Sequence, residues 1–212
     1  IYFIGGHKMT THLVIDDFTP PSVINQLGGA LLGSDATWKF RDQSSGADAV
    51  DPDDKNIRET PQFIHEIFHD KEQGIQSHVF EVAKMPLMFL EHYMGNNIKM
   101  PIRIKANLLL QDKESKGKYH APHIDVANED AFSMVYYLHD SDGDTILFDK
   151  KLSKFGGHTD LVELDRITPK KGRAVIFNSN RFHASSSPLI DQRRVIVNYV
   201  FFADKTFLTK NT

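Results

Sequence analysis

The sequence predicts an α+β protein in which helices cover one face of an antiparallel double-sheet barrel, or jelly roll. Three observations predict this class. Helical patterns lie mainly before residue 100, strand-like runs follow one another after it, and one of those runs, residues 132–138, is apolar on nearly both faces. A strand of that kind is expected where a sheet lies between a core and a layer of helices.

The 212 residues fit a single domain that is large enough to bury a core. Residues 1–8 resemble a vector remnant, since they contain a Tyr-Phe and a Gly-Gly pair, and Met9 resembles a natural start. We therefore expect one domain over residues 9–212. Within it, residues 9–100 are predicted to form a mainly helical support and residues 101–204 the jelly-roll catalytic core.

Composition excludes several classes of protein. No apolar run approaches the roughly 20 residues that span a bilayer, so no membrane anchor is expected. The net charge of -3 gives no overall basic footprint and argues against a nucleic-acid-binding module. The absence of cysteine excludes disulfides and thiolate metal sites. Together with the absence of a secretory signal, it predicts an intracellular, cytoplasmic protein.

The first half predicts a few short elements before the main sheet. Residues 13–15 form a short apolar run typical of a strand, and Pro20-Pro21-Ser22 opens a helix with apolar residues at helical spacing. Residues 38–40 predict another strand. The stretch 42–55 is almost wholly polar and predicts a loop, for which a lid over the substrate is one hypothesis.

A second helix is expected over residues 76–93, kinked or divided at Pro86 because proline lacks the amide donor. Val79, Val82 and Phe89 would then face a sheet. From residue 102 onwards the pattern changes to strands separated by turns rich in glycine and aspartate. The expected strands are residues 102–110, 132–138, 145–148, 161–164, 174–178 and 195–202.

A candidate metal site is the central feature of the second half. His123 and Asp125 are two residues apart, so in a strand both side chains would project to the same side. His183 is the expected third ligand. Two imidazoles and one carboxylate on one face of an octahedron leave positions open, which suits ferrous iron that also binds a co-substrate and dioxygen. The pattern therefore predicts an oxygenase.

A second His-x-Asp pattern leaves an alternative open. His158 and Asp160 also lie two residues apart, but only a short way before His183, with room for about two strands between them. The interval from Asp125 to His183 holds several strand-like runs, enough to bring a distant strand back beside the first. The sequence favours His123 and Asp125 as the ligands.

Five elements of the second half occur in a specific order. They are His123-Ile124-Asp125, Tyr136-Tyr137-Leu138 with residues 143–148, residues 169–177, His183, and Arg193 leading into Tyr199-Val200-Phe201. In this order they resemble the catalytic domain of prolyl 4-hydroxylase-like Fe(II)/2-oxoglutarate dioxygenases, over about residues 102–202. The N-terminal region resembles, more loosely, the helical support of compact bacterial and viral members. One departure is residues 142–145, Asp-Gly-Asp-Thr, where many relatives have Gly-Gly-Glu-Thr; we expect it to disturb the turn little.

The resemblance implies how cofactors are held. Iron would bind His123, Asp125 and His183, and 2-oxoglutarate would chelate the metal through its keto group and adjacent carboxylate. Arg193 lies ten residues after His183, where the family places the cation for the far carboxylate, and a guanidinium fork matches a carboxylate in two-pronged fashion. The neighbouring arginine at position 194 competes for this role, with a side chain on the opposite face of a regular strand. Tyr137 would donate a hydrogen bond to the same carboxylate.

The resemblance also suggests Tyr119 as a further co-substrate contact and ascorbate as an additional cofactor. The implied activity consumes dioxygen and 2-oxoglutarate, releases succinate and carbon dioxide, and hydroxylates a prolyl or other residue of a peptide or protein, or a small molecule such as a free amino acid. Two other classes stay open. One is the same chemistry on a nucleobase, which calls for a basic groove and a stacking aromatic; the other is a non-enzymatic metal-binding jelly roll, which needs no carboxylate receptor.

Overall fold

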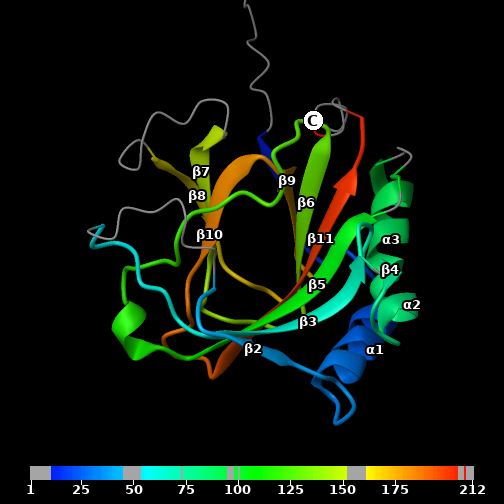
Figure 1. Ribbon diagram of the computed structural model, residues 1–212, viewed down its shortest axis with the longest axis horizontal. Helices are drawn as coiled ribbons and strands as arrows, with labels where there is room; N and C mark the ends of the chain where they lie inside the picture. Colours follow the sequence, from blue (N-terminus) through cyan, green and yellow to red (C-terminus); the bar gives the residue numbers. More distant parts are fainter. Residues whose placement is uncertain are drawn as a thin grey trace, which may run out of the picture.

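Two antiparallel sheets face each other, and helices cover the outer face of the larger one (Figure 1). The computed structural model describes residues 11–44, 54–72, 74–94, 98–99, 101–151, 161–204 and 208. Its strands are β1 (His12–Ile15), β2 (Lys39–Arg41), β3 (Gln62–His69), β4 (Gly74–Ile75), β5 (Pro101–Leu110), β6 (Ala131–Tyr137), β7 (Thr145–Lys151), β8 (Glu163–Ile167), β9 (Ala174–Asn178), β10 (Arg181–Ser185) and β11 (Arg193–Phe202). Its helices are α1 (Pro21–Leu32), α2 (Phe80–Ala83) and α3 (Met85–Met94), with a 3-10 turn at Lys113–Ser115.

The larger sheet has the strand order β1-β9-β6-β11-β5-β3-β2, with β4 paired to β3, and the smaller sheet has the order β10-β7-β8. Every strand pairing is antiparallel. This is a double-stranded β-helix core, as the sequence predicted. Strands that are far apart in the sequence lie side by side, because the late strand β11 pairs with both β5 and β6.

The helices pack on the outer face of the larger sheet. Helix α1 begins with Pro21 in its first turn, where the missing amide costs nothing. Val23, Ile24, Leu27 and Leu31 are its buried residues, and they recur at the spacing of one helical face. Three of them join the main hydrophobic cluster, which also contains outward-facing residues of the central strands.

The predicted helix over residues 76–93 is shorter and divided. It begins at Phe80, and a break at Lys84 separates α2 from α3, which has Pro86 as its second residue. Gln76 is outside the helix because its amide donates to the carbonyl of Ile67 in β3. Val79 is buried, as expected of a residue that faces the sheet.

Strand β6 is buried along its whole length, which confirms the pattern read from residues 132–138. Its neighbouring tyrosines point to opposite faces. Tyr136 packs in the cluster beneath the helices, and its hydroxyl lies 2.6 Å from that of Thr19. Tyr137 packs between the two sheets, together with Val135 and Ile196. Because side chains alternate between the two faces of a strand, Tyr136 packs beneath the helices and Tyr137 faces the interior of the barrel.

The sequence did not predict strands β3, β4 and β10, and it placed the start of β8 two residues too early. Strands β3 and β10 carry polar residues on the face that lines the barrel interior, such as Gln62 in β3 and His183 in β10. These inward-facing polar residues interrupt the alternation of apolar and polar residues that is typical of a strand. Among the described residues, no helix is both long and apolar enough to cross a membrane. The predictions for residues 1–8, for His158 and Asp160, and for positions 45–53 of the polar loop lie outside the described residues and stay predictions.

Candidate metal and co-substrate site

His123 and His183 are brought together by their backbones. The amide of each donates to the carbonyl of the other at 2.9 Å, which forms an isolated antiparallel bridge. His183 belongs to β10, whereas His123 lies in the connection before β6 rather than in the regular strand that the sequence predicted. The ring centroids of the two histidines are 4.4 Å apart. Thus the two imidazoles meet through a local pairing of distant segments.

Asp125 completes the cluster from a bend two residues after His123. Its amide donates to the carbonyl of Ser179 at 3.0 Å, which turns the carboxylate toward the histidines. One carboxylate oxygen, Oδ2, lies 3.6 Å from Nε2 of His183. The other, Oδ1, accepts a hydrogen bond of 2.5 Å from Nη2 of Arg103 in β5. The carboxylate side chain is only 4% exposed, so these partners fix its orientation.

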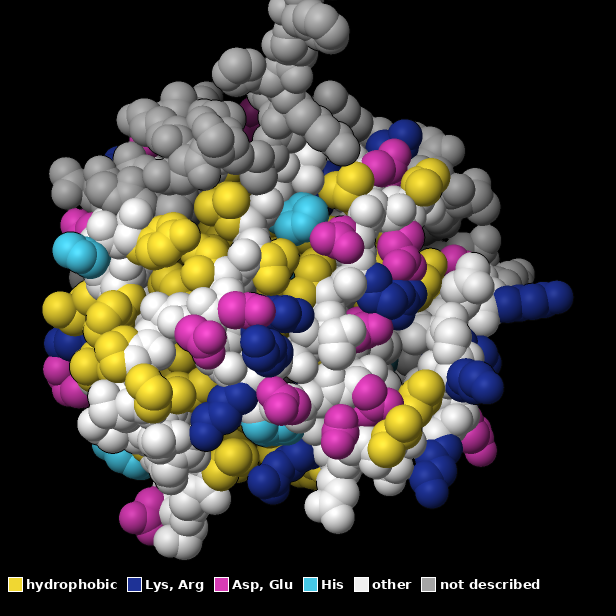
Figure 2. Space-filling view, turned by 180° about the vertical axis from the view of Figure 1, so that it is seen from behind, with side chains coloured by type: hydrophobic (Ala, Val, Ile, Leu, Met, Phe, Trp, Pro, Cys, Tyr) yellow, Lys and Arg dark blue, Asp and Glu magenta, His cyan; other side chains and the backbone are white. Residues whose placement is uncertain are grey.

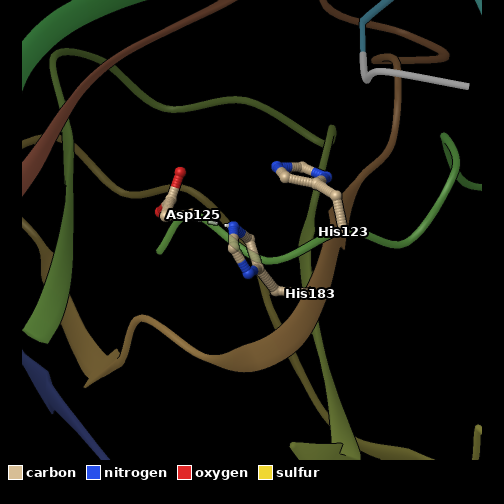
Figure 3. A group of neighbouring side chains, drawn as sticks. All are labelled: His123, Asp125 and His183. Carbon is tan, nitrogen blue, oxygen red and sulfur yellow. Dashed lines mark ion pairs between the residues drawn. The ribbon is translucent and has the colours of Figure 1, made fainter. Parts of the chain in front are cut away.

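The three side chains fit a divalent transition metal. One ligand atom from each of His123, Asp125 and His183 lies within 4.8 Å of the others, and the side chains converge on one point (Figure 3). The Nδ1 atoms of the two histidines lie 3.3 and 3.0 Å from the carbonyls of Ala121 and Arg181, as N–H donors would. This leaves each Nε2 free to bind metal, an arrangement typical of histidine ligands. Two imidazoles and one carboxylate suit ferrous iron with open positions.

The environment favours the ligand forms of these groups. Burial lowers the pKa of His123 to about 3, and the nearby His183 ring acts in the same direction, so the imidazole is neutral at physiological pH. Burial alone would raise the pKa of Asp125. The guanidinium of Arg103 outweighs this effect, with help from both histidines and the Ser133 hydroxyl, and holds that pKa well below its usual range. His123 and Asp125 are therefore already in the forms that bind a metal ion.

The cluster opens into a small cavity of about 60 Å³ inside the barrel. Residues from both sheets line it: Ser44, Gln62, Lys105, Asn107, Leu109, His123, Asp125, Val135, Thr145, His183, Ala184, Ser185, Arg194, Ile196 and Asn198. Arg194 contributes a fixed positive charge, since its side chain is only 4% exposed. A pocket with metal ligands and one buried guanidinium suits a small anion that also binds the metal.

The choice of Arg193 as the co-substrate arginine is wrong in its geometry, because the structure places this residue at the exposed start of β11. Residues 194, 196 and 198 line the cavity, whereas Val195 and Val197 pack beneath the helices. The strand face predicted for the co-substrate arginine was therefore off by one residue. Arg194 is the arginine in a position to meet a bound carboxylate.

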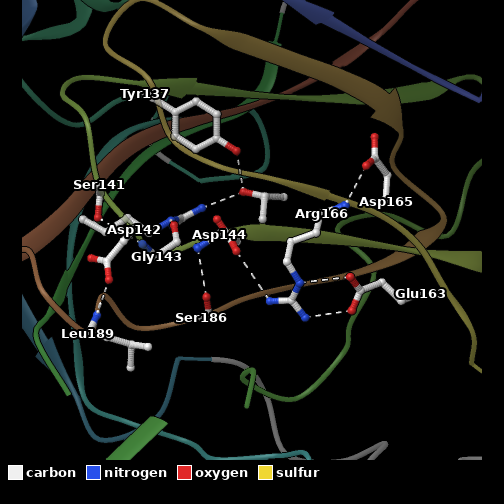
Figure 4. Close-up of polar contacts among 12 residues, drawn as sticks. Tyr137, Ser141, Asp142, Gly143, Asp144, Glu163, Asp165, Arg166, Ser186 and Leu189 are labelled. Carbon is white, nitrogen blue, oxygen red and sulfur yellow. Dashed lines mark hydrogen bonds and ion pairs between the residues drawn. The ribbon is translucent and has the colours of Figure 1, made fainter. Parts of the chain in front are cut away.

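Tyr137 lies on the predicted side of β6, but behind the cavity wall. Its hydroxyl donates to Oγ1 of Thr145 at 2.6 Å, and its ring centroid lies 5.6 Å from the Arg194 guanidinium carbon (Figure 4). Arg194 donates to the same Thr145 oxygen at 2.7 Å and to the carbonyl of Gly143 at 2.8 Å. Tyr137 thus supports both the threonine and the arginine. Its direct hydrogen bond to a co-substrate stays a prediction.

The turn before β7 must approach Arg194 closely. A Cβ atom on Gly143 would lie 2.7 Å from the carbonyl oxygen of Ser186 and 3.0 Å from Cδ of Arg194, so only glycine fits. The preceding Asp142 accepts hydrogen bonds of 3.0 Å from three successive amides, those of residues 189, 190 and 191. Asp142 therefore ties this turn to the segment that leads into β11, so the departure at residues 142–145 leaves the turn well anchored.

Tyr119 lies outside the described lining of the cavity. Its ring packs edge to face against Phe148 at a centroid distance of 5.4 Å, and its backbone forms a parallel bridge with Ile57. Its contact with the co-substrate stays a prediction. Two further residues, Arg103 and Lys105, were not singled out from the sequence. A signal was present, because with Asn107 they place a polar residue at every second position of an otherwise apolar strand, which predicts one face toward a polar site.

Residues 109–202 match the family model described as the 2OG-Fe(II) oxygenase superfamily. The matched segment contains all three candidate ligands and Arg194. This segment of the chain is therefore similar to a 2OG-Fe(II) oxygenase domain. No curated protein matches its sequence.

Solved structures share the fold of this protein at low sequence identity. A 2OG-Fe(II) oxygenase family oxidoreductase from Burkholderia pseudomallei has a TM-score of 0.63 at 13% identity, over 91% of this chain and 85% of that one. The epimerase SnoN of nogalamycin biosynthesis scores 0.61 at 12% identity, over 92% and 78%. A prolyl hydroxylase from Trichoplax adhaerens, solved with a peptide of hypoxia inducible factor, scores 0.54 at 14% identity, over 95% and 87%. These likenesses establish the fold.

Arg103 is expected to control the metal affinity of the candidate site without touching the metal. Replacing it by alanine removes the donor that orients Asp125, and changes to such outer partners typically weaken metal binding about 10- to 100-fold. The measurement is Mn(II) titration of the purified variant, followed by calorimetry. Arg193→Ala removes an exposed arginine and is the matched control. Equal affinities for both variants would show that the Arg103–Asp125 pair does not support the site.

We expect the buried His120 to make the folded protein less stable in mild acid. It is 1% exposed, and burial lowers its pKa to about 4, while an unfolded histidine titrates near 6.5. Between these values the unfolded chain binds a proton that the folded chain does not, so stability falls as pH drops from about 6.5 toward 4. We expect His120 alone to remove about 2 kcal/mol between pH 7 and pH 5.

Urea unfolding in the presence of a chelator measures this effect. His120 is held by hydroxyls, with Ser185 at 2.9 Å from Nδ1 and Thr60 at 2.9 Å from Nε2, so His120→Gln is a conservative replacement. The variant should lose about 2 kcal/mol less than the wild type over the same pH interval. Parallel losses in the two proteins would contradict the assignment.

Proposed function

We propose that the protein is an Fe(II)- and 2-oxoglutarate-dependent dioxygenase that hydroxylates an organic substrate and releases succinate and carbon dioxide. One observation carries the proposal. A cluster of two histidines and one aspartate shares a small cavity with the buried guanidinium of Arg194. 2-Oxoglutarate can chelate a metal at one end and carries a carboxylate at the other. The ligand cluster would bind the first end through the metal, and the guanidinium of Arg194 would bind the second.

Each residue has a defined task in this proposal. His123, Asp125 and His183 would hold the iron, and the bound metal would supply the redox chemistry that activates dioxygen. Arg194 would bind the far carboxylate of 2-oxoglutarate through its guanidinium, which the hydroxyl of Thr145 and the carbonyl of Gly143 already orient. The surrounding apolar side chains of Leu109, Val135 and Ile196 would exclude water from the reacting groups.

Hydroxylation of a peptide residue or of an amino acid is the leading reaction. The structural neighbours include a prolyl hydroxylase solved with a peptide and an epimerase, so this fold accommodates different outcomes of related chemistry. Ascorbate stays a prediction, to be tested by adding it to the assay. A nucleobase substrate has less support, because the net charge of -3 gives no overall basic footprint. Acidic and basic side chains are interspersed over the one face seen in Figure 2. A purely structural metal has less support too, since it needs no buried arginine beside it.

The test is the consumption of 2-oxoglutarate. Purified protein, loaded anaerobically with Fe(II) and 2-oxoglutarate, is exposed to oxygen with candidate peptides, amino acids and oligonucleotides while succinate is measured. We expect slow succinate formation alone and faster formation with a true substrate. An absence of succinate in protein that binds iron and 2-oxoglutarate would contradict the proposed activity.

A further inference from the structure

A second, larger cavity of about 510 Å³ adjoins the metal pocket on the concave face of the larger sheet. Strands β2, β3 and β5 and the start of the following loop line it, with the residues Arg41, Asp42, Gln43, Ser44, Gln62, Ile64, Glu66 and Lys105. We call this cavity the polar groove. Ser44, Gln62 and Lys105 line both the polar groove and the metal pocket, so the two spaces are continuous.

Two of the cations on this face of the barrel, Arg103 and Arg194, already have partners. Arg103 is paired with Asp125, and Arg194 is held by Thr145 beside the three clustered ligands, where it would bind the co-substrate carboxylate. Lys105 lies between these sites and the groove. Within the described part of the chain, its ammonium has no hydrogen-bond or ion-pair partner, although Glu66 is opposite it in the strand register. One positive charge therefore remains unassigned at the junction of the two spaces.

We propose that the polar groove binds a free amino acid, with Lys105 holding its carboxylate and Glu66 its amine. The proposal rests on the function proposed above, because the metal pocket would then act on a carbon of this amino acid. Arg41 in β2 lies on the same groove and adds positive charge at its far end. A molecule anchored at Lys105 extends directly into the pocket that holds His123, Asp125 and His183.

The charges of the groove favour a free amino acid over a peptide. Burial lowers the pKa of Lys105 to about 8, with the charge of Arg103 acting in the same direction, so the ammonium is already poorly solvated. A peptide backbone laid over it would cover this charge without a counter-charge, and covering an unpaired charge is costly. A carboxylate would neutralise the ammonium instead. The cavity volume, about 510 Å³, lies within the range of small-molecule sites.

The experiment measures binding to the protein loaded with Mn(II) and 2-oxoglutarate, where no turnover occurs. Each of the twenty common L-amino acids is titrated by calorimetry, and every binder is compared with its carboxamide and its N-acetyl form. We expect at least one amino acid to bind, and both modified forms to bind roughly tenfold more weakly or worse. This comparison needs only the wild-type protein. Failure of every amino acid to bind, or equal binding of the carboxamide, would overturn the proposal.

Variants assign the two charges to residues. Lys105→Met keeps the length of the side chain and should weaken the amino acid roughly tenfold or more, while Lys105→Arg should restore most of the affinity. Glu66→Gln should weaken the free amino acid but not its N-acetyl form. Lys84→Met, on the helix side of the sheet, is the matched control. An amino acid whose affinity is the same in Lys105→Met as in the wild type would overturn the assignment.

The two proposals fail in different ways. Affinities for Mn(II) and 2-oxoglutarate are measured first in every variant, and the amino-acid titrations are then compared at saturating concentrations of both. A wild-type protein that binds neither of them contradicts the proposed dioxygenase, and the amino-acid titration of the metal-free protein then still tests the groove. A protein that binds both but no amino acid retains the dioxygenase site and refutes only the inference about its substrate.

Discussion

Replacing Arg194 by alanine is expected to weaken 2-oxoglutarate binding by roughly 2 to 5 kcal/mol, or about 30- to several thousand-fold. The guanidinium is buried in the wall of the metal pocket, so a carboxylate bound there would lose its counter-charge in a poorly solvated site. Burial already lowers the pKa of Arg194, which indicates that its charge lacks solvent. Metal affinity should be unchanged, because Arg194 is not one of the clustered ligands.

Two further variants make this test specific. Arg193→Ala removes the adjacent, exposed arginine and should leave 2-oxoglutarate affinity within about twofold of the wild type. Arg194→Lys keeps the charge but loses the two-pronged geometry, so it should bind more tightly than Arg194→Ala and more weakly than the wild type. Calorimetric titration of 2-oxoglutarate into Mn(II)-loaded protein gives all three affinities. If only Arg193→Ala lost affinity for 2-oxoglutarate, the co-substrate would bind on the other face of β11.

Loss of one ligand is expected to abolish stoichiometric metal binding. His123→Ala, Asp125→Asn and His183→Ala each remove one of three donors that lie within 4.8 Å of one another. The loss should exceed the roughly 10- to 100-fold effect expected of an outer partner such as Arg103. His158→Ala is the control for the alternative ligand pair. Metal bound per chain is measured by atomic spectroscopy after equilibrium dialysis, and circular dichroism reports whether each variant is folded.

A dependence on His158 and Asp160, with His123 dispensable, would contradict this assignment. Asp125→Asn is preferred over alanine because the amide still fills the space beside Arg103 and retains an acceptor for it. Removing the whole side chain would leave a guanidinium without its partner, and the resulting loss of stability would obscure the loss of metal.

The sequence predicted the fold well where burial dominates. Strand β9 has the predicted boundaries, and β5, β6 and β11 differ by one or two residues, because their apolar runs are long and bounded by turns. Strand β3 was not predicted, since Gln62 and Glu66 face the polar groove and break the apolar alternation. Strand β10 was not predicted either, because its polar residues serve the metal site. Prediction thus failed where strands carry the residues of the site.

The sequence predicted the three side chains that cluster in the candidate metal site, but it chose the arginine on the other face of β11. The His123-Ile124-Asp125 motif can be read directly from the sequence. The strand-like runs between Asp125 and His183 indicate that the chain folds back and brings His183 beside this motif. The face of Arg194 depends on the length of the segment between β10 and β11, which spacing from His183 did not fix. A better signal was present in β11 itself: Asn198 is the one amide side chain among apolar neighbours, and it shares its face with Arg194. Alternation from Asn198 predicts the correct arginine.

The visible spectrum of the anaerobic protein shows whether the metal cluster and Arg194 bind 2-oxoglutarate together. Adding 2-oxoglutarate to Fe(II)-loaded protein should produce a charge-transfer band that saturates at one equivalent per chain. The band should be absent in His183→Ala and should require a much higher 2-oxoglutarate concentration in Arg194→Ala. Protein that binds iron at the three ligands but develops no band, or that titrates identically without the Arg194 side chain, would contradict the account.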